Sequence, residues 1–330
     1  MRNNLIQPCR VRAAIATFHH GEFAVLDALR EAKSQQGIAV SLCIPTLNEE
    51  DTIGEVVSCL RSALQERVPL LDEVAVVDSG SSDRTREVAA AAGAEVHLAS
   101  EILPEAGPAR GKGENIWKAV HQLRGDILCF VDGDVRNMHP RFVYGPLGVL
   151  LRQPQVSYVK GFYDRPHAAV EIGVRPAGGG RVTEALVRPL FSLFFPELAG
   201  LVQPLAGEYA ARRSVLEAIA MPSGYGVETA HLIDVLQGWG AGALAQCDLD
   251  ERIHRHQDTA SLGRMSFSIL RAFLLRARRD GILHAAADLP DVYRQFVRDE
   301  GVMRLIEARL EDLERPPLRG LAAYRERHPR

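Results

Sequence analysis

The chain has 330 residues, of which 46% are hydrophobic and 25% are charged, and its formal net charge is -3. This composition is typical of a soluble globular enzyme with a substantial core, and the small net charge gives no overall attraction to nucleic acid or to an anionic membrane. The five cysteines are widely spaced and include no C-x-x-C pair. A zinc cluster and a disulfide framework are therefore not expected, and a reducing, cytoplasmic location is favoured.

No segment carries the signals of export or of membrane insertion. The N-terminus, MRNNLIQPCRVRAA, lacks the apolar region of a secretory signal. The most apolar long stretch, residues 186–206, is interrupted by two charged residues and three prolines. We therefore expect neither a secretory signal nor a membrane span.

The first part of the chain alternates between strand-like and helix-like segments. Residues 1–37 are expected to form a helical N-terminal segment, with a helix over 19–37. Strands are expected at 38–45, 73–78, 94–99 and 127–131, and helices at 51–64, 83–93 and 115–123. Strands separated by helices of this length indicate an α/β fold with a parallel sheet that is covered on both faces.

The pattern becomes less regular after Asp134, and residues 136–262 are expected to form a second half of the molecule. From about residue 263, apolar residues such as Leu270, Phe273 and Leu305 recur at helical spacing in an arginine-rich sequence. We expect residues 263–330 to form a helical tail that serves as a dimer contact, so that the protein is a homodimer.

Three expected strands end in polar, acidic segments: PTLNEED (45–51), DSGSSDRT (78–85) and DGD (132–134). An Asp-Gly pair alone would indicate a turn. Because ligands bind at the carboxyl ends of parallel strands, however, three acidic strand ends at the same edge indicate a binding site.

Two common nucleotide-binding motifs are absent. The first strand is followed by PTLNEE, which contains no glycine, so the G-x-G-x-x-G of a dinucleotide-binding fold is missing. The segment GPARGKG (107–113) has the wrong spacing for a P-loop, and a glycine stands where the magnesium-binding hydroxyl belongs.

A metal site that binds the diphosphate of a nucleotide sugar agrees better with the FVDGD segment. In an extended segment, Asp132 and Asp134 project to the same side, so both can contribute oxygens to Mg²⁺ or Mn²⁺. Such a metal acts as a Lewis acid and stabilises the charge that develops on the departing nucleoside diphosphate.

The strand-end motifs, together with GKGEN before a helix, resemble those of GT-A glycosyltransferases. The second half is similar to the family of glucosyl-3-phosphoglycerate synthases and mannosyl-3-phosphoglycerate synthases, and the resemblance covers about residues 38–260. It rests on GGGRVTEALVRPL (178–190), QPLAGEYAARR (203–213), GYGVETAHLID (224–234) and HRH (254–256).

This resemblance implies a GT-A (Rossmann-like) fold, with a mostly parallel sheet flanked by helices and a C-terminal helical appendage. Residues 38–135 would bind the nucleotide sugar and residues 136–262 the acceptor. The implied reaction is a retaining, metal-dependent transfer of a hexose from UDP-glucose or GDP-mannose to the 2-hydroxyl of 3-phosphoglycerate.

The resemblance also implies roles for individual residues. The metal would be held by Asp132, Asp134 and His254. Asp134, Glu228 and the carbonyl of Leu205 would lie at the reacting centre, where Glu228 would bind the sugar hydroxyls. The residues expected to bind the donor are Pro45, Thr46, Leu47, Glu49, Asp78, Ser79, Lys112, Asp132, Tyr225 and Glu228.

Acceptor binding is assigned to the residues that follow a glycine run. Gly180, Arg181, Val182 and Thr183 offer backbone N–H groups, a guanidinium and a hydroxyl, which together suit the phosphate or carboxylate of 3-phosphoglycerate. His256 would also face the acceptor. Members of the family tend to have asparagine facing the acceptor at that position, so this departure leaves the acceptor contacts, or the choice of donor, open.

Other functions stay open at this stage. An inverting glycosyltransferase would use Glu228 as general base on another acceptor, although the chain has no Q-x-x-R-W motif. A sugar nucleotidyltransferase would need a glycine-rich basic loop after the first strand, and a non-catalytic sugar-nucleotide binder would show no metal-dependent turnover. The choice between UDP-glucose and GDP-mannose is also open, because it depends on loop geometry and one or two hydrogen bonds.

Overall fold

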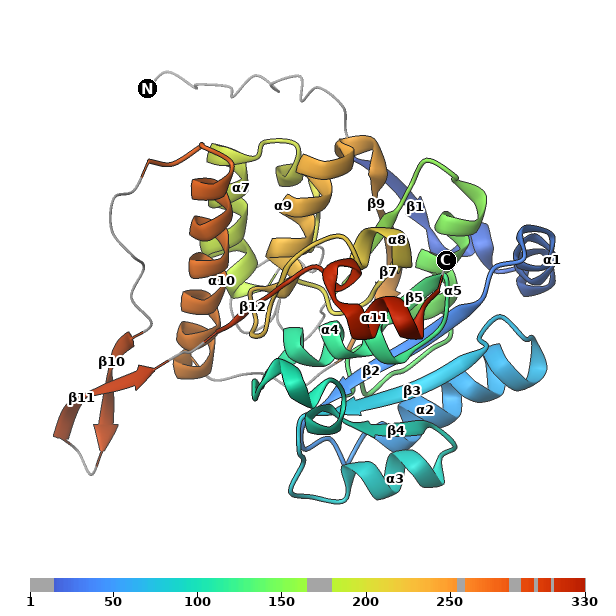
Figure 1. Ribbon diagram of the computed structural model, residues 1–330, viewed down its shortest axis with the longest axis horizontal. Helices are drawn as coiled ribbons and strands as arrows, with labels where there is room; N and C mark the ends of the chain where they lie inside the picture. The colour runs from blue at the N-terminus through green and yellow to red at the C-terminus, as the bar shows by residue number, and fades with distance from the viewer. Residues whose placement is uncertain are drawn as a thin grey trace, which may run out of the picture.

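An eight-stranded sheet runs through the centre of the molecule (Figure 1). The computed structural model describes residues 15–164, 180–253, 259–284, 292–299, 302–309 and 312–329. In the order β1-β9-β6-β7-β5-β2-β3-β4, β7 runs antiparallel to both neighbours and the other pairs are parallel. The strands are β1 (Ala16–His19), β2 (Val40–Thr46), β3 (Glu73–Asp78), β4 (Glu95–Leu98), β5 (Ile127–Phe130), β6 (Tyr158–Asp164), β7 (Tyr209–Arg212) and β9 (Leu244–Glu251). The predicted α/β class with a mostly parallel sheet is confirmed.

Helices cover both faces of this sheet (Figure 1). The α-helices are α1 (Leu26–Gln36), α2 (Ile53–Arg61), α3 (Thr85–Ala91), α4 (Lys112–Gln122), α5 (Arg141–Arg152), α7 (Arg188–Phe194), α8 (Arg213–Leu216), α9 (Val227–Trp239), α10 (Thr259–Arg279) and α11 (Ala322–Arg327). Shorter 3-10 or π turns are η1 (His20–Phe23), η2 (Ser62–Arg67), η3 (Ala99–Glu101), η4 (Pro104–Ala106), η5 (Thr183–Val187), η6 (Leu198–Gly200), η7 (Ala241–Ala243) and η8 (Leu318–Gly320).

The core is divided into two layers by the alternation of side chains along the strands. In β2, Cys43 points into one layer, whereas Leu42 and Ile44 point into the other. The first layer contains buried residues of α4, α7, α9 and α10, and the second contains those of α1, α2, α3 and α5. Because both faces are covered, the central strands read as continuous apolar runs rather than as alternating ones.

The N-terminal part differs from the prediction. Residues 16–19 form the edge strand β1, which pairs in parallel with β9. The helix expected over 19–37 begins only at Leu26, because the preceding backbone is extended along the sheet or in a short 3-10 turn. Gly37 ends α1 in the left-handed conformation, with a φ of 62°.

The C-terminal tail is helical only in part. Helices α10 and α11 agree with the prediction, but β10 (Val292–Asp299) and β11 (Val302–Arg309) form an antiparallel hairpin. The prediction of helix around Leu305 is therefore wrong. β10 contains two valines and two aromatic residues, and β11 contains one valine and one isoleucine. These residue types favour an extended backbone, and each strand supplies hydrogen bonds to the other.

The rest of the tail returns to the main body. Strand β12 (Glu314–Arg315) pairs with β8 (Met221–Pro222), which directly precedes the loop before α9. Within the described ranges, no helix combines the length and apolar character needed to cross a bilayer. The boundaries expected for the two halves and the tail stay predictions.

Candidate active site

The carboxyl ends of β2, β3 and β5 meet at one edge of the sheet, as expected. Thr46 donates its hydroxyl to Oδ2 of Asp78 at 2.9 Å. A Cβ added to Gly133 would lie 3.2 Å from Cγ2 of Thr46, so the DGD segment packs directly against the end of β2. Asp78 is fully buried and also accepts the N–H groups of Gly80 and Ser81, at 3.0 and 2.7 Å. Its carboxylate therefore holds together the loops that follow β2 and β3.

The other donor-site candidates on these loops lie at the same edge. Leu47 is 53% exposed, and Pro45 and Glu49 are half-buried. Ser79 donates its hydroxyl to Oδ1 of Asn115 on α4 at 2.9 Å. The residues are thus placed where a donor could reach them, and their contacts with it stay predictions.

Asp132 and Asp134 share one cationic group, the guanidinium of Arg252. Nη2 of Arg252 lies 3.1 Å from Oδ2 of Asp132 and 2.7 Å from Oδ1 of Asp134. Its Nη1 lies 3.2 Å from Oε2 of Glu208 and 2.6 Å from the hydroxyl of Tyr163. Two carboxylate oxygens that meet at one positive group can also meet at a divalent cation, so the acid pair fits the expected Mg²⁺ or Mn²⁺ site.

Lys112 joins the acid pair to Glu228. Its Nζ lies 2.7 Å from Oδ1 of Asp132 and 2.8 Å from Oε1 of Glu228, which is buried in the first turn of α9. Lys112 begins α4, and a Cβ added to Gly113 would lie 1.9 Å from the carbonyl oxygen of Pro222. Glycine is thus required for α4 to approach closely enough for this contact. We refer to Lys112, Asp132, Asp134, Glu228 and Arg252 as the charged cluster.

Burial opposes ionisation in the charged cluster, but pairing outweighs it. Burial would raise the pKa of Asp132, yet the charges of Lys112 and Arg252 hold that pKa well below its usual range. Burial would lower the pKa of Lys112, yet Asp132 and Glu228 raise it well above its ordinary value. Asp132 and Lys112 are therefore both ionised at neutral pH.

Lys160, on β6, is a buried cation beside the charged cluster. It is 1% exposed, and its Nζ has no hydrogen-bond partner in the described part of the chain. The amine lies 4.7 Å from the centre of the Tyr209 ring. Burial lowers the pKa of Lys160 to about 8, although the charge of Glu228 opposes this effect. An unpaired buried amine costs stability, which favours a role in ligand binding over a role in the fold.

Arg252 and Lys160 are not among the site residues predicted from the sequence. Arg252 stands in the charged run DLDERIHRH, two residues before His254, and residues at this spacing in an extended segment share one side. Lys160 is the lysine in the otherwise apolar centre of YVKGFYD. The position of each residue in its segment is visible in the sequence, but the sequence does not show which groups the side chain meets in the fold.

The segment that contains Leu205 passes beside the acid pair. A Cβ added to Gly207 would lie 2.1 Å from Oδ1 of Asp132, so the backbone there must approach the carboxylate closely. Leu205 is half-buried, and Tyr225, before α9, is 47% exposed. His254 and His256 lie outside the described residues, so their expected metal and acceptor contacts stay predictions.

The acceptor candidates begin the helical stretch that leads into α7. The N–H of Glu184 donates to the carbonyl oxygen of Gly180 at 3.0 Å. Val182 and Thr183 are buried, and Arg181 is exposed. The glycines before Gly180 lie outside the described residues, so the anion-binding role of this segment stays a prediction.

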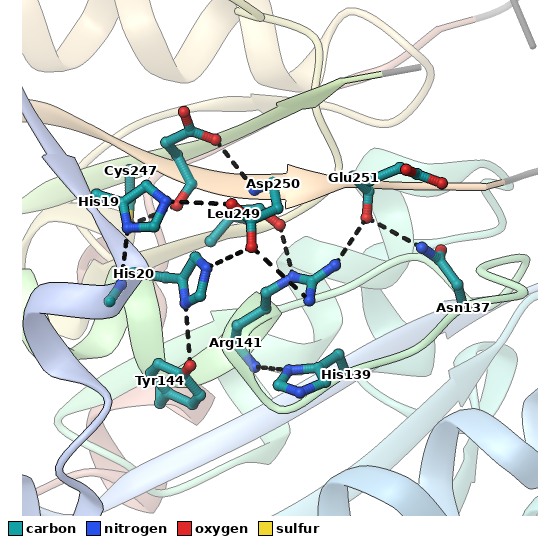
Figure 2. Close-up of polar contacts among 12 residues, drawn as sticks. His19, His20, Asn137, His139, Arg141, Tyr144, Cys247, Leu249, Asp250 and Glu251 are labelled. Atoms are coloured by element: carbon teal, nitrogen blue, oxygen red, sulfur yellow. Dashed lines mark hydrogen bonds and ion pairs between the residues drawn. The ribbon is translucent and has the colours of Figure 1, made fainter. Parts of the chain in front are cut away.

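Figure 2 shows how the end of β9, which leads to Arg252, is held in place. Arg141 donates its Nε to the carbonyl oxygen of Leu249 at 2.6 Å and its Nη2 to that of Glu251 at 3.1 Å. Asn137, shortly after the DGD segment, donates its Nδ2 to the same Glu251 oxygen at 3.0 Å. These bonds fix the position of the strand end relative to the acid pair.

His19, His20 and Asp250 form a second polar group near this strand end (Figure 2). Nε2 of His19 lies 3.1 Å from Oδ1 of Asp250, and Nε2 of His20 lies 2.7 Å from its Oδ2. Among the described residues, their ligand atoms are close enough to hold a metal, all within 4.8 Å. However, Nδ1 of His19 accepts the N–H of Gly21 at 3.0 Å, which places the ring proton of the neutral imidazole on Nε2. Nε2 could bind a metal only without this proton. We therefore interpret the three residues as a hydrogen-bonded group that supports β9.

Comparison with known sequences gives matches over nearly the whole chain. The model of glycosyl transferase family 2 matches residues 41–144. A glucosyl-3-phosphoglycerate synthase of Petrotoga mobilis is 46% identical over 311 residues, which cover 94% of this chain and 95% of that protein. One of Mycobacterium tuberculosis is 41% identical over 245 residues, which cover 74% and 75%.

Solved structures give the same result. The mannosyl-3-phosphoglycerate synthase of Rubrobacter xylanophilus matches with a TM-score of 0.86 and 41% identity, over 93% of this chain and 97% of that one. The glucosyl-3-phosphoglycerate synthase of Mycobacterium tuberculosis in complex with Mn²⁺, UDP-glucose and phosphoglyceric acid matches with a TM-score of 0.81 and 35% identity, over 93% and 99%.

Proposed function

Because this chain belongs to the family of hexosyltransferases that comprises the glucosyl- and mannosyl-3-phosphoglycerate synthases, we propose that it transfers glucose from UDP-glucose to 3-phosphoglycerate. Its membership confirms the resemblance predicted from the sequence. In 3-phosphoglycerate the 2-hydroxyl is the only free hydroxyl group, so it is the acceptor atom. The product is glucosyl-3-phosphoglycerate.

The observation that carries this proposal is the charged cluster. A nucleotide sugar brings a diphosphate that must be neutralised, and its departure leaves additional negative charge. Asp132 and Asp134 provide two oxygens for a divalent cation, and Lys112 and Arg252 provide two further positive groups beside them. A related protein of 35% identity is described with Mn²⁺ and UDP-glucose bound.

Asp132 and Asp134 would hold Mg²⁺ or Mn²⁺, with His254 as the third protein ligand. When bound, the metal supplies Lewis-acid stabilisation of the leaving diphosphate. Arg252 then exchanges its contact with the acid pair for a contact with a phosphate oxygen, because both guanidinium edges suit oxyanions. Lys112 stays in contact with Asp132 and supplies positive charge on the other side of the diphosphate.

Glu228 orients the sugar in this proposal. Its carboxylate is paired with Lys112 at 2.8 Å and can accept hydrogen bonds from sugar hydroxyl groups. The acceptor hydroxyl then attacks from the face that the diphosphate leaves, and its proton passes to the departing phosphate oxygen. The configuration at the anomeric carbon is therefore retained.

The acceptor is bound by Gly180, Arg181, Val182 and Thr183, with His256 nearby. Arg181 is exposed at the start of a helical stretch, where backbone N–H groups point toward an approaching anion. A guanidinium at this position can bind the phosphate or the carboxylate of the acceptor with two hydrogen bonds.

The test is an assay with 3-phosphoglycerate and Mg²⁺ in which UDP-glucose and GDP-mannose are supplied in turn. We expect a metal-dependent product of the mass of glucosyl-3-phosphoglycerate, with the α-anomeric signal in proton NMR spectra taken early in the reaction. Release of UDP without a glycoside product would contradict the acceptor assignment. A β-linked product would instead make Glu228 the general base of an inverting enzyme.

Mannosyl transfer from GDP-mannose is the second candidate. It is favoured by the likeness to the Rubrobacter xylanophilus mannosyl-3-phosphoglycerate synthase, which covers 93% of this chain. A ratio of kcat/KM values for the two donors, measured at one 3-phosphoglycerate concentration, decides between them.

A homodimer in the cytoplasm completes the proposal. The β10–β11 hairpin projects away from the main body (Figure 1), and a two-stranded hairpin is marginally stable alone, which favours packing against a second subunit. Light scattering after size exclusion tests the dimer.

The cytoplasmic location is supported by the cysteines. Cys43, Cys59, Cys129 and Cys247 are free thiols, in agreement with a reducing compartment.

A further inference from the structure

A large cleft lies at the edge of the sheet opposite the charged cluster. Its volume is about 1380 Å³, and it is lined by the segments that precede β2 and β5, by the start of α8 and by the C-terminal residues 319–329. The charged cluster follows the carboxyl ends of β2 and β5, whereas this cleft adjoins their amino ends. Since β2 has seven residues, the two places are about 20 Å apart.

The lining of this cleft is strongly basic, although the whole chain has a net charge of -3. Arg124, Arg212, Arg213, Arg319, Arg325 and Arg327 face only two carboxylates, those of Asp126 and Glu217. Both acids are already engaged, because Asp126 accepts the N–H of Ala39 and Glu217 accepts the hydroxyl of Tyr324, each at 2.9 Å. We refer to this hollow as the arginine cleft.

Two of the arginines are held rigidly by neutral groups. Arg213 donates to the carbonyl oxygens of Val120, Leu123 and Gly125 at 2.6 to 2.7 Å. Arg212 donates to carbonyl oxygens at 2.7 and 3.0 Å, and burial lowers its pKa, because no carboxylate offsets the loss of water. Carbonyl groups orient a guanidinium but leave its charge uncompensated.

Three other arginines are accessible to a ligand. Arg124, Arg319 and Arg325 are exposed, and none forms an ion pair with any residue that the structure describes. They approach the cleft from two chain segments, the α4–β5 turn and the C-terminal region around α11. The arginine cleft thus combines two arginines held by carbonyl groups with three exposed ones.

We propose that the arginine cleft is a second binding site, separate from the active site, for a small phosphorylated anion. Every cationic side chain in it is an arginine, and the planar guanidinium matches a phosphate with paired hydrogen bonds better than lysine does. The lining contains few apolar side chains, so a hydrophobic partner segment is not suited to it. The volume is sufficient for a nucleotide or a phosphorylated acid.

The test compares two variants of equal charge change by calorimetry, in Mg²⁺-free buffer of constant ionic strength. The first carries Arg319→Glu and Arg325→Glu. The matched control carries Arg30→Glu and Arg67→Glu, two arginines outside the cleft. The probes are inorganic phosphate, pyrophosphate, 3-phosphoglycerate and UDP. Since the active site is the same in both variants, a difference between them reports on the cleft.

We expect at least one probe to bind the cleft variant roughly tenfold or more weakly than it binds the wild type and the control. Weakening limited to UDP identifies a nucleotide site, and weakening of 3-phosphoglycerate identifies a site for a phosphorylated acid. Weakening of phosphate and pyrophosphate alone identifies an inorganic phosphate site. Equal binding by all three proteins, or equal weakening in both variants, overturns the proposal.

A second measurement separates this outcome from the proposed reaction. Glycosyl transfer, with the two substrates as the only phosphorylated anions in the assay, should have the same kcat and KM in the cleft variant as in the control, which also shows that both are folded. The binding result does not depend on which reaction is found, because it is read from the difference between the two variants.

Discussion

At the scale of single residues, Asp134 has a role that can be separated from folding. Its side chain is 30% exposed, and Arg252 would keep its contacts with Asp132 and Glu208 if Asp134 were removed. Asp134→Ala should therefore lower kcat/KM by roughly a hundredfold or more, through loss of transition-state charge stabilisation, and leave the melting temperature nearly unchanged. Asp27→Ala, at an exposed ion pair on α1, is the control. Full activity of Asp134→Ala at saturating Mg²⁺ would disprove the metal assignment.

Lys160 should show opposite effects on stability and on activity. Methionine has a similar length and no charge, so Lys160→Met removes an unpaired buried amine without leaving a cavity. We expect the free energy of unfolding to rise by about 1–3 kcal/mol and kcat/KM to fall by about tenfold. Urea denaturation and initial rates measure the two quantities. Higher stability with unchanged activity would show that Lys160 has no part in the reaction.

The same residue predicts a dependence of stability on pH. The pKa of Lys160 is lowered from 10.5 to about 8 in the folded state, so the unfolded chain binds this proton more tightly between these values. The free energy of unfolding of the wild type should therefore rise with pH across this window, by up to about 3 kcal/mol relative to Lys160→Met. Below this window the difference should be constant. Urea titrations of both proteins at several pH values measure this difference in unfolding free energy. If the wild type gains no stability relative to Lys160→Met across the window, the amine is not desolvated as described.

The sequence predicted the acidic half of the charged cluster better than its cationic half. Asp132, Asp134 and Glu228 stand in motifs whose spacing and neighbours mark them, and Lys112 lies between two glycines. Arg252 carries no such mark, because an arginine in a charged run is usually a solvated one. Its role depends on β9 pairing with β6, which in turn pairs with β7, and such pairing of distant segments cannot be read from local sequence.

At the scale of elements, a buried ion pair attaches the C-terminal tail to α4. Arg315 on β12 contacts both oxygens of Glu114, at 2.8 and 2.9 Å, and Glu114 is fully buried. The guanidinium also lies 5.2 Å from the centre of the Trp117 ring. Because α4 begins at Lys112, this pair also supports the charged cluster.

Breaking this pair should therefore affect both stability and donor binding. In Arg315→Met, the buried Glu114 keeps only one cationic partner, Lys118, at 3.4 Å. The substitution should lower the free energy of unfolding by about 3–5 kcal/mol. The KM for the nucleotide sugar should rise as well. Adding Glu114→Gln should restore part of the stability, because it removes a buried charge that has lost its guanidinium partner. If the double variant is no more stable than Arg315→Met, the cost does not come from the charge of Glu114.

The elements predicted least well are those stabilised by distant partners. The strands β2, β3 and β5 were recognisable from their apolar runs. Strand β1 pairs with β9 at the edge of the sheet and has only four residues, three of which are exposed. Its local sequence pattern therefore gives no signal for a strand. The β10–β11 hairpin was mistaken for helix because Val302 and Leu305 fit a helical spacing as well as a strand.

At the scale of the whole molecule, the net charge is -3, so the anionic substrates of the proposed reaction would have to be bound by local cationic groups. Raising the salt concentration from about 0.1 M to about 1 M shortens the screening length from about 10 Å to about 3 Å. The KM for 3-phosphoglycerate should therefore rise several-fold, while kcat should change little because a saturating acceptor concentration compensates for weaker binding. Initial rates in sodium chloride and in potassium acetate measure this effect. A KM that is independent of both salts would show that the acceptor is not held by charge.

The guanidinium of Arg252 between the two carboxylates has a practical consequence for handling the protein. In many metalloenzymes, removal of the ion leaves adjacent acids that repel one another and loosen the fold. Here the chain carries its own replacement charge, so treatment with a chelator should yield a folded apoprotein that withstands storage and regains activity when the ion is returned. The same replacement charge competes with the incoming ion. Free metal should therefore bind weakly, and the donor diphosphate, which gives Arg252 a new partner, should make reconstitution far easier.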